Sequence, residues 1–164
     1  MFDKFGEMGS YEEINELAAN LLKEGDKEGL KTMASENGIP EDYVMMFMDG
    51  DIPFLTDRLT AAVGKLDLET KELGLKGLME DWVEYIRGLC TENPEMAAAV
   101  RAKGKSLTEC MGKLLKYSFE NREHVNPEIV KAAKIKASRV DFGIPGTGEA
   151  KKMIREYYLG GGEG

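Results

Sequence analysis

Hydrophobic residues recur along most of this chain at the spacing of a helix. Between Ser10 and Glu24 they return every third or fourth position, at Ile14, Leu17, Ala18, Leu21 and Leu22. A second clear pattern surrounds Trp82, in the segment from Leu78 to Cys90. This spacing places the apolar side chains on one face of a helix, where they can form a core. The pattern predicts an all-α protein of about seven to nine short helices in a bundle.

Polar residues mark where these helices begin and end. Two Ser-x-x-Glu capping boxes start at Ser10 and Ser106, and two Asn-Pro-Glu starts stand at Asn93 and Asn126. In both devices a side-chain oxygen accepts a free backbone N–H of the first turn. Gly38 is expected to close one helix in the left-handed conformation that glycine tolerates.

The predicted helices cover residues 10–24, 27–36, 41–49, 53–66 and 78–90, and later ones begin at Asn93, Ser106, Asn126 and Glu149. Residues 66–77 are expected to form a connector, and residues 140–142 a short extended piece. In the later helices, the apolar residues predicted to be buried include Leu114, Leu115, Ile129, Val130 and Ala133. Three regions follow: an acidic three-helix unit (residues 1–52), a larger helical domain with a basic face (53–159) and a flexible glycine-rich tail (160–164).

The second and third helices resemble a helix-turn-helix pair. The helix that would read DNA, residues 41–49, has three acidic residues and no Lys or Arg. Affinity for DNA depends largely on neutralised phosphates, so this helix is poorly suited to bind it. Its methionines Met45, Met46 and Met48 cannot all face inward. They suit either a protein-binding surface or a wide buried face between helices.

Charge changes the picture most, because the two signs are separated along the sequence. The first 59 residues contain 14 acidic and 5 basic residues, whereas residues 101–140 contain 10 basic and 4 acidic ones, in a chain of net charge −8. Such a separation of charge affects which partners a protein attracts and how they are steered toward it, but it does not determine the fold. The basic stretch is either a solvated face that balances the acidic half or a surface for RNA, DNA or an acidic protein.

We therefore take both charged regions as candidate binding sites. The basic candidates are Lys103, Lys105, Lys113, Lys116, Arg122, Lys131, Lys134, Lys136 and Arg139. The acidic candidates are Glu41, Asp42, Asp49 and Asp51. A ribonucleoprotein could satisfy both signs at once, because it has basic protein channels beside exposed phosphates.

Little in the sequence points to catalysis, a metal or a cofactor. His124 is the one histidine, in a polar run, and the two cysteines, Cys90 and Cys110, fall on apolar helix faces as buried thiols do. Residues 49–51 lack the remaining ligands of a calcium loop, and residues 143–148 lack the Gly-Lys-Ser/Thr ending of a nucleotide-binding loop. We expect a binding protein without catalytic residues or cofactor. The chain shows no membrane-length apolar run and no secretory signal, so a cytoplasmic location is expected.

Four segments of the last 60 residues resemble the PcfK-like proteins of plasmids, conjugative elements and phages. These segments are GKSLTECMGKLLKY (104–117), VNPEIV (125–130), FG (142–143) and REYY (155–158). The resemblance includes the cysteine at Cys110 and the pair Tyr157-Tyr158, but this chain then ends in glycines where the family tends to continue with acids. That family includes anti-CRISPR proteins. The resemblance implies a protein of a bacterial host cell that binds the guide-RNA-loaded type II CRISPR nuclease and blocks target recognition or cleavage.

Two alternative functions stay open. A DNA-binding or conjugation accessory protein would use the same basic face on bare DNA. A regulatory or adaptor protein would use the helix-turn-helix-like pair, although its acidic residues disfavour DNA reading.

Overall fold

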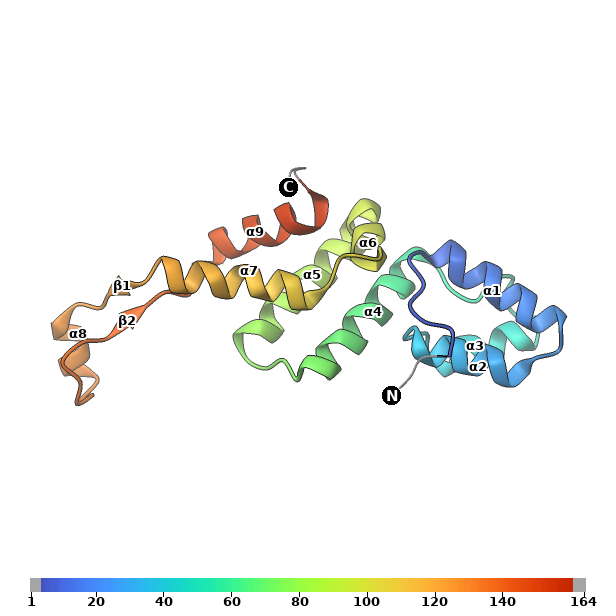
Figure 1. The fold of residues 1–164 in the computed structure, drawn as a ribbon, viewed down its shortest axis with the longest axis horizontal. Coiled ribbons are helices and arrows are strands. Elements are labelled where there is room, and N and C mark those ends of the chain that lie inside the picture. The colour runs from blue at the N-terminus through green and yellow to red at the C-terminus, as the bar shows by residue number, and fades with distance from the viewer. Residues whose placement is uncertain (1–3, 161–164) are drawn as a thin grey trace.

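The computed structural model describes residues 4–160 and shows an elongated, almost entirely helical molecule (Figure 1). Within that range there are nine helices and one two-stranded sheet, which confirms the all-α prediction. The helices are α1 (Tyr11–Lys23), α2 (Lys27–Glu36), α3 (Glu41–Met48), α4 (Arg58–Leu73), α5 (Leu78–Glu92), α6 (Pro94–Arg101), α7 (Leu107–Glu120), α8 (Pro127–Ala132) and α9 (Thr147–Leu159). The strands are β1 (Glu123–His124) and β2 (Asp141–Phe142). Apart from Gly160, which caps α9, the predicted tail lies outside the described residues.

Two hydrophobic clusters form the core. The first joins α1, α2 and α3 with the segment before α4, and includes Ile14, Leu30 and Val44. The second joins α4, α5, α6, α7 and α9 around Trp82 and Ile86. Trp82 is 9% exposed and packs in this core. Because α4 contributes Ala61 to the first cluster and Ala62 to the second, it connects the two.

A close approach of two glycines fixes α4 against the N-terminal helices. Gly38 follows α2 with a φ of +75°, the left-handed conformation expected from the sequence. A Cβ on Gly64 in α4 would lie 2.5 Å from the carbonyl oxygen of Gly38. Only glycine therefore lets α4 pass this close to the turn after α2.

The predicted helix starts are confirmed by their capping hydrogen bonds. Ser10 accepts the N–H of Glu13, and Ser106 accepts the N–H of Glu109, each at 3.1 Å. Asn93 and Asn126 accept the N–H two residues on, each at 2.8 Å. The local sequence determines these starts because donor and acceptor lie within one turn.

The prediction for α4 was wrong at both ends. The helix starts at Arg58 and not at Pro53, and it continues through most of the expected connector to Leu73. The side-chain amide of Asn15 on α1 forms two hydrogen bonds with the backbone of Thr56. Its nitrogen donates to the Thr56 carbonyl at 3.0 Å, and its oxygen accepts the Thr56 N–H at 2.9 Å. This pairing keeps the segment before Asp57 out of the helix, and the Asp57 side chain then caps α4 by accepting the N–H of Thr60 at 2.7 Å.

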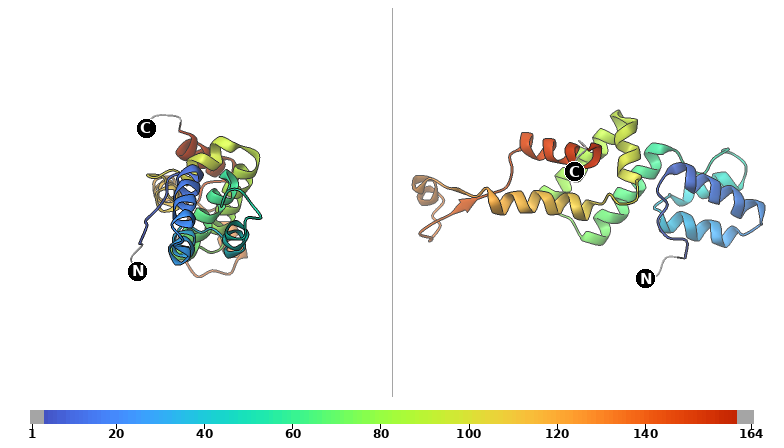
Figure 2. Two further views of the ribbon diagram at one scale, coloured as in Figure 1. Left: turned by 90° about the vertical axis from the view of Figure 1, so that its right-hand side faces the viewer. Right: turned by 45° about the horizontal axis from the view of Figure 1, so that its top comes forward.

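Residues 121–146 form a projection, which we name the basic arm. Figures 1 and 2 show α7 running outward from the bundle into β1, α8 and β2, which extend beyond the end of α9. The strands pair antiparallel, with Glu123 opposite Phe142 and His124 opposite Asp141. β2 confirms the extended piece expected at residues 140–142, whereas β1 was not predicted.

The arm has almost no core of its own, which corrects the burial predicted for α8. Ile129 is 62% exposed and Ala133 is exposed, while Val130 is half-buried. Leu115 on α7 was also predicted to be buried and is 50% exposed. These residues have helical spacing, but no helix within residues 4–160 covers their face. An apolar face without a covering element is often an interaction surface.

Candidate functional site: a basic arm opposite an acidic unit

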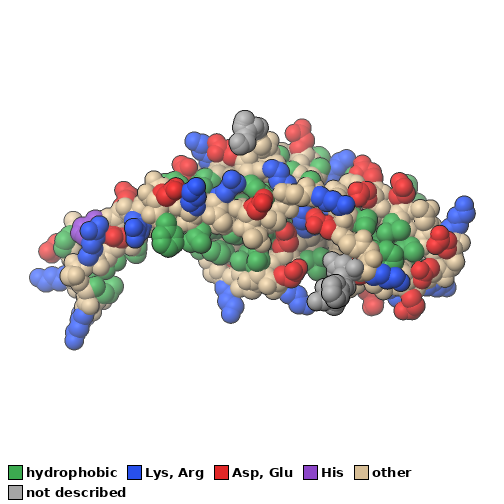
Figure 3. Space-filling model, viewed as in Figure 1, with side chains coloured by type: hydrophobic (Ala, Val, Ile, Leu, Met, Phe, Trp, Pro, Cys, Tyr) green, Lys and Arg blue, Asp and Glu red, His purple; other side chains and the backbone are tan. Residues whose placement is uncertain are grey.

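The structure divides the nine basic candidates into three places. Lys103 and Lys105 precede α7, and Lys113 and Lys116 lie on its surface. The other five, which are Arg122, Lys131, Lys134, Lys136 and Arg139, are all exposed on the basic arm. In the space-filling view the end of the arm carries mainly basic side chains (Figure 3). The arm therefore gathers the largest group of these candidates on one projection.

The tip of the arm has the most concentrated positive charge. Residues 131–139 contain four basic residues and no acidic one. Lys134 has a φ of +58°, which is unusual for a residue other than glycine, and this conformation ends α8 and turns the chain. The turn keeps Lys131, Lys134 and Lys136 within one short segment of exposed backbone. Closely spaced, solvated ammonium groups are suited to contact the phosphates of a nucleic acid.

One carboxylate organises the base of the arm. Asp141 accepts the Nε–H of Arg139 through Oδ1 at 3.0 Å, and the same oxygen lies 3.2 Å from Nδ1 of His124. The hydrogen bonds from Arg139 and then from His124 hold the pKa of Asp141 below its usual value. His124 is exposed, as the sequence suggested, and it supports the strand pair β1–β2. Arg139 is partly neutralised here, which leaves Arg122, Lys131, Lys134 and Lys136 as the more available cations.

Lys105 is occupied within the protein. Its ammonium donates to the backbone carbonyl of Tyr157 at 2.7 Å and lies 4.7 Å from the centre of the Tyr157 ring. The Tyr157 hydroxyl donates to Glu109 and accepts the N–H of Ser106, both at 2.8 Å. Burial, together with the bond to Glu109, raises the pKa of this phenol to about 12, although the hydrogen bond from the Ser106 N–H opposes the shift. Lys105 thus attaches α9 to the start of α7 and has little freedom to bind a partner.

The acidic candidates lie at the opposite end of the molecule. Glu41 and Asp42 are in the first turn of α3, Asp49 caps its end, and Asp51 follows. All four are exposed. Met45 on the same helix is 47% exposed, which confirms that at least one of its methionines faces solvent. The arm and this unit project from opposite ends of the bundle, so their charges do not neutralise each other (Figures 1 and 3).

Sequence reasoning missed two buried cations where the two core clusters meet. Arg101 at the end of α6 donates to the carbonyls of Met8 at 2.8 Å, Asn37 at 2.9 Å and Ala61 at 3.0 Å, and also to the Asn37 side chain. It is 3% exposed, and burial lowers its pKa although nearby glutamates oppose this. Its position one residue after Val100 and four after Ala97 placed it on the buried face of α6. Its charge had suggested a position exposed to solvent.

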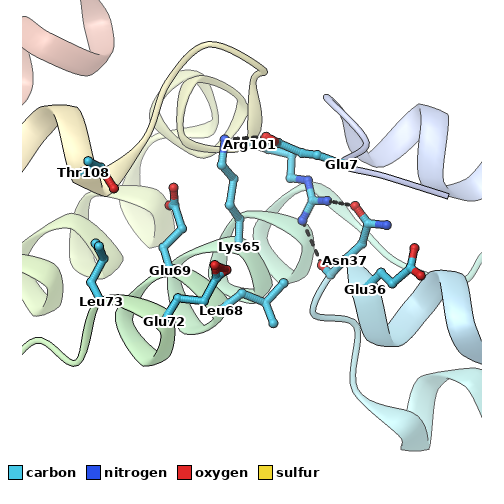
Figure 4. Close-up of a pocket in the computed structure, with 10 residues that line it drawn as sticks. All are labelled: Glu7, Glu36, Asn37, Lys65, Leu68, Glu69, Glu72, Leu73, Arg101 and Thr108. Carbon is cyan, nitrogen blue, oxygen red and sulfur yellow. Dashed lines mark hydrogen bonds and ion pairs between the residues drawn. The ribbon is translucent and has the colours of Figure 1, made fainter. Parts of the chain in front are cut away.

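Lys65 on α4 is the second of these cations. Its ammonium donates to the carbonyls of Ala102 at 2.9 Å and Lys105 at 2.8 Å, and it pairs with Glu7 at 2.9 Å. Lys65, Arg101, Glu7 and Asn37 all line a hollow of about 220 Å³. Figure 4 shows Lys65 in contact with Glu7 and Arg101 in contact with Asn37. Lys65 and Arg101 both contact residues of the N-terminal unit. These contacts fix the N-terminal helices to the bundle.

Chemically reactive groups are scarce and shielded in the described part of the chain. Burial raises the pKa of Cys90 to about 11 and that of Cys110 to about 12, so both thiols are protonated at neutral pH. Among residues 4–160, no group of three or more His, Cys, Asp or Glu side chains could hold a metal ion. Over the same residues, no helix has the length and apolar character needed to cross a bilayer.

Comparisons with protein-family models, with curated proteins and with solved structures give no match for this chain. The resemblance of residues 104–158 to the PcfK-like family therefore stays a prediction, and the argument for function depends on the surfaces described above.

Proposed function

We propose that this chain is a binding protein that inhibits a guide-RNA-loaded type II CRISPR nuclease, with the basic arm as its main contact to nucleic acid. The observation that carries the proposal is the group of five exposed basic side chains on a projection with almost no core. A projection of this kind can reach phosphates that a flat surface cannot. Release of counterions from those phosphates would supply much of the affinity.

The acidic unit at the other end suits the protein part of such a partner. RNA-guided nucleases hold their RNA–DNA heteroduplex in a positively charged channel. The exposed carboxylates of Glu41, Asp42, Asp49 and Asp51 have the sign that this channel accepts. One molecule could then contact guide phosphates with its arm and compete with target DNA through its acidic unit. The choice of this partner among nucleoproteins rests on the PcfK-like resemblance.

A cleavage assay tests the proposal. The purified chain is added in increasing molar excess to a guide-loaded type II nuclease, and both cleavage of target DNA and copurification are measured. We expect the wild type to copurify with the complex and to reduce cleavage. The variant Lys131→Glu, Lys134→Glu, Lys136→Glu should lose at least about tenfold in apparent affinity, because three phosphate contacts become repulsive.

A matched variant separates the effect of the arm on inhibition from the effect of net charge. Lys23, Lys27 and Lys31 are exposed lysines of the acidic end, and their change to Glu alters total charge by the same amount. This variant should inhibit as the wild type does. Full cleavage in large excess of the wild-type chain would refute the proposal, and equal losses in the two variants would refute the role of the arm.

The second candidate function is a DNA-binding accessory protein of a mobile element, which the same exposed arm favours. It predicts salt-sensitive binding to bare duplex DNA and no effect on the nuclease. Binding of a short duplex, measured beside the cleavage assay, distinguishes the two functions.

A further inference from the structure

The N-terminal unit has an apolar groove. The groove has a volume of about 590 Å³ and lies between α1 and the segment that precedes α4. Tyr11, Phe47 and Phe54 form its apolar surface, and Phe54 is 65% exposed. Glu12, Glu16 and Asp57 also line it, and the nearby cation Arg58 lies over the Tyr11 ring, 5.2 Å from its centre. A groove of this composition suits an apolar side chain that is flanked by positive charge.

The tip of the basic arm has the complementary composition. Ile129 and Ile135 are 62% and 52% exposed, although the interior would be the usual place for isoleucine. Lys131, Lys134 and Lys136 alternate with them along the same short segment. The tip thus presents aliphatic side chains surrounded by ammonium groups.

These two surfaces cannot meet within one molecule. The groove belongs to the N-terminal unit, and Figure 1 places that unit and the arm at opposite ends of an elongated molecule. The helices between them are fixed by the contacts of Arg101 and Lys65. A second copy of this chain can bring an arm to the groove.

We propose that the basic arm of one molecule docks in the apolar groove of another, which gives head-to-tail self-association. Ile129 and Ile135 enter the groove, and the surrounding lysines face Glu12 and Glu16. A two-fold contact between arms would instead place like charges together, which is unfavourable. A head-to-tail contact leaves one arm and one groove free at the two ends of an open assembly, so further copies can add there. The arm is also the contact of the proposed function, so nucleic acid and self-association compete for it.

Charge reversal on each surface tests this contact. The average mass of the full chain is measured by sedimentation up to about 0.5 mM in low salt, where weak contacts become populated. The mass of the wild type should rise steadily with concentration. Two variants, the groove variant Glu12→Lys, Glu16→Lys and the arm variant Lys131→Glu, Lys134→Glu, should each remain monomeric. Mixing them should restore association, since the unchanged arm of the groove variant fits the unchanged groove of the arm variant and the reversed arm fits the reversed groove.

A second groove variant tests the same contact without changing any charge. Phe54→Ser removes an exposed ring and should weaken self-association at least tenfold with an unchanged circular dichroism spectrum. A monomeric wild type, a mass that stops at two copies, or no restoration on mixing would each contradict the head-to-tail contact. Capture of a basic segment of another protein by this groove, without self-association, would contradict it as well.

The second groove variant also separates this inference from the proposed function. Because Phe54 lines the groove, carries no charge and lies far from the arm, Phe54→Ser should lose self-association and keep binding to the guide-loaded nuclease.

Discussion

At the scale of single residues, the most informative side chains are the cations that the fold encloses. Arg101 and Lys65 resemble the surface lysines in charge, yet each contacts backbone carbonyls from distant parts of the chain. Arg101 is suited to this place because its guanidinium has several donors in a fixed plane. Arg101 was counted in the basic stretch of the sequence and was not placed inside, because its three carbonyl partners lie 40 to 93 residues away and could not be predicted from the sequence.

Replacement of Arg101 tests its part in joining the two core clusters. Arg101→Ala leaves the carbonyls of Asn37 and Ala61 buried without this donor, and it should lower the free energy of unfolding by about 2–4 kcal/mol. Urea denaturation measures this. The matched change Lys103→Ala, at an exposed position two residues on, should stay within about 0.5 kcal/mol of the wild type. Similar losses for both would show that the contacts of Arg101 are not important for stability.

Glu69 provides a test that depends on pH. Its Oε1 is buried and has no hydrogen-bond partner among the described residues, while Oε2 accepts the N–H of Leu107 at 3.2 Å. Burial raises the pKa of Glu69 above its ordinary 4.5, although Lys65 opposes the shift. The folded state then binds the proton more tightly than the unfolded state, so this group lowers stability as pH rises above 4.5.

Glu69→Gln removes that charge. The variant should have a higher Tm than the wild type near pH 7, and the difference should shrink as pH falls toward 4.5, where the wild-type carboxyl becomes protonated. Calorimetry at several pH values measures this. A less stable variant near pH 7 would mean that Lys65 outweighs the burial of Glu69, and a Tm difference that stays constant with pH would mean that the pKa of Glu69 is not raised.

At the scale of elements, the sequence predicted what is encoded within one turn and missed what depends on distant contacts. The caps at Ser10, Asn93, Ser106 and Asn126 were predicted correctly because their donors and acceptors lie within one turn of the chain. The start of α4 was missed because Asn15 and Thr56, 41 residues apart, hold the preceding segment. β1 has two residues, too few to show a period, and its pairing depends on β2.

Two glycines in helices should respond in opposite ways to alanine. Gly64→Ala places a methyl group 2.5 Å from the carbonyl oxygen of Gly38, and the resulting displacement of α4 should cost about 1–3 kcal/mol. Gly88 in α5 has nothing within 4 Å of an added Cβ, so Gly88→Ala should gain about 0.5–1 kcal/mol from helix propensity. Thermal unfolding of both variants measures the contrast, and a stabilised Gly64→Ala would contradict the close packing of α4.

At the scale of the whole molecule, the separation of charge in the sequence becomes a separation in space. An internal contact between the acidic and basic halves was the alternative left open by the sequence. In the structure, the arm and the N-terminal unit stand at opposite ends, and the buried cations Arg101 and Lys65 occupy the middle (Figures 1 and 4). The arrangement leaves one end for an anionic partner and the other for a cationic one.

The salt dependence of binding tests most directly whether the arm contacts phosphates. The association constant for the guide-loaded nuclease is measured over a series of salt concentrations for the wild type and for Lys131→Gln, Lys134→Gln, Lys136→Gln. Each lost phosphate contact should reduce the slope of log K against log salt by about 0.7–0.9, so the two slopes should differ by about 2–3. Equal slopes for the two proteins would show that the arm does not bind nucleic acid.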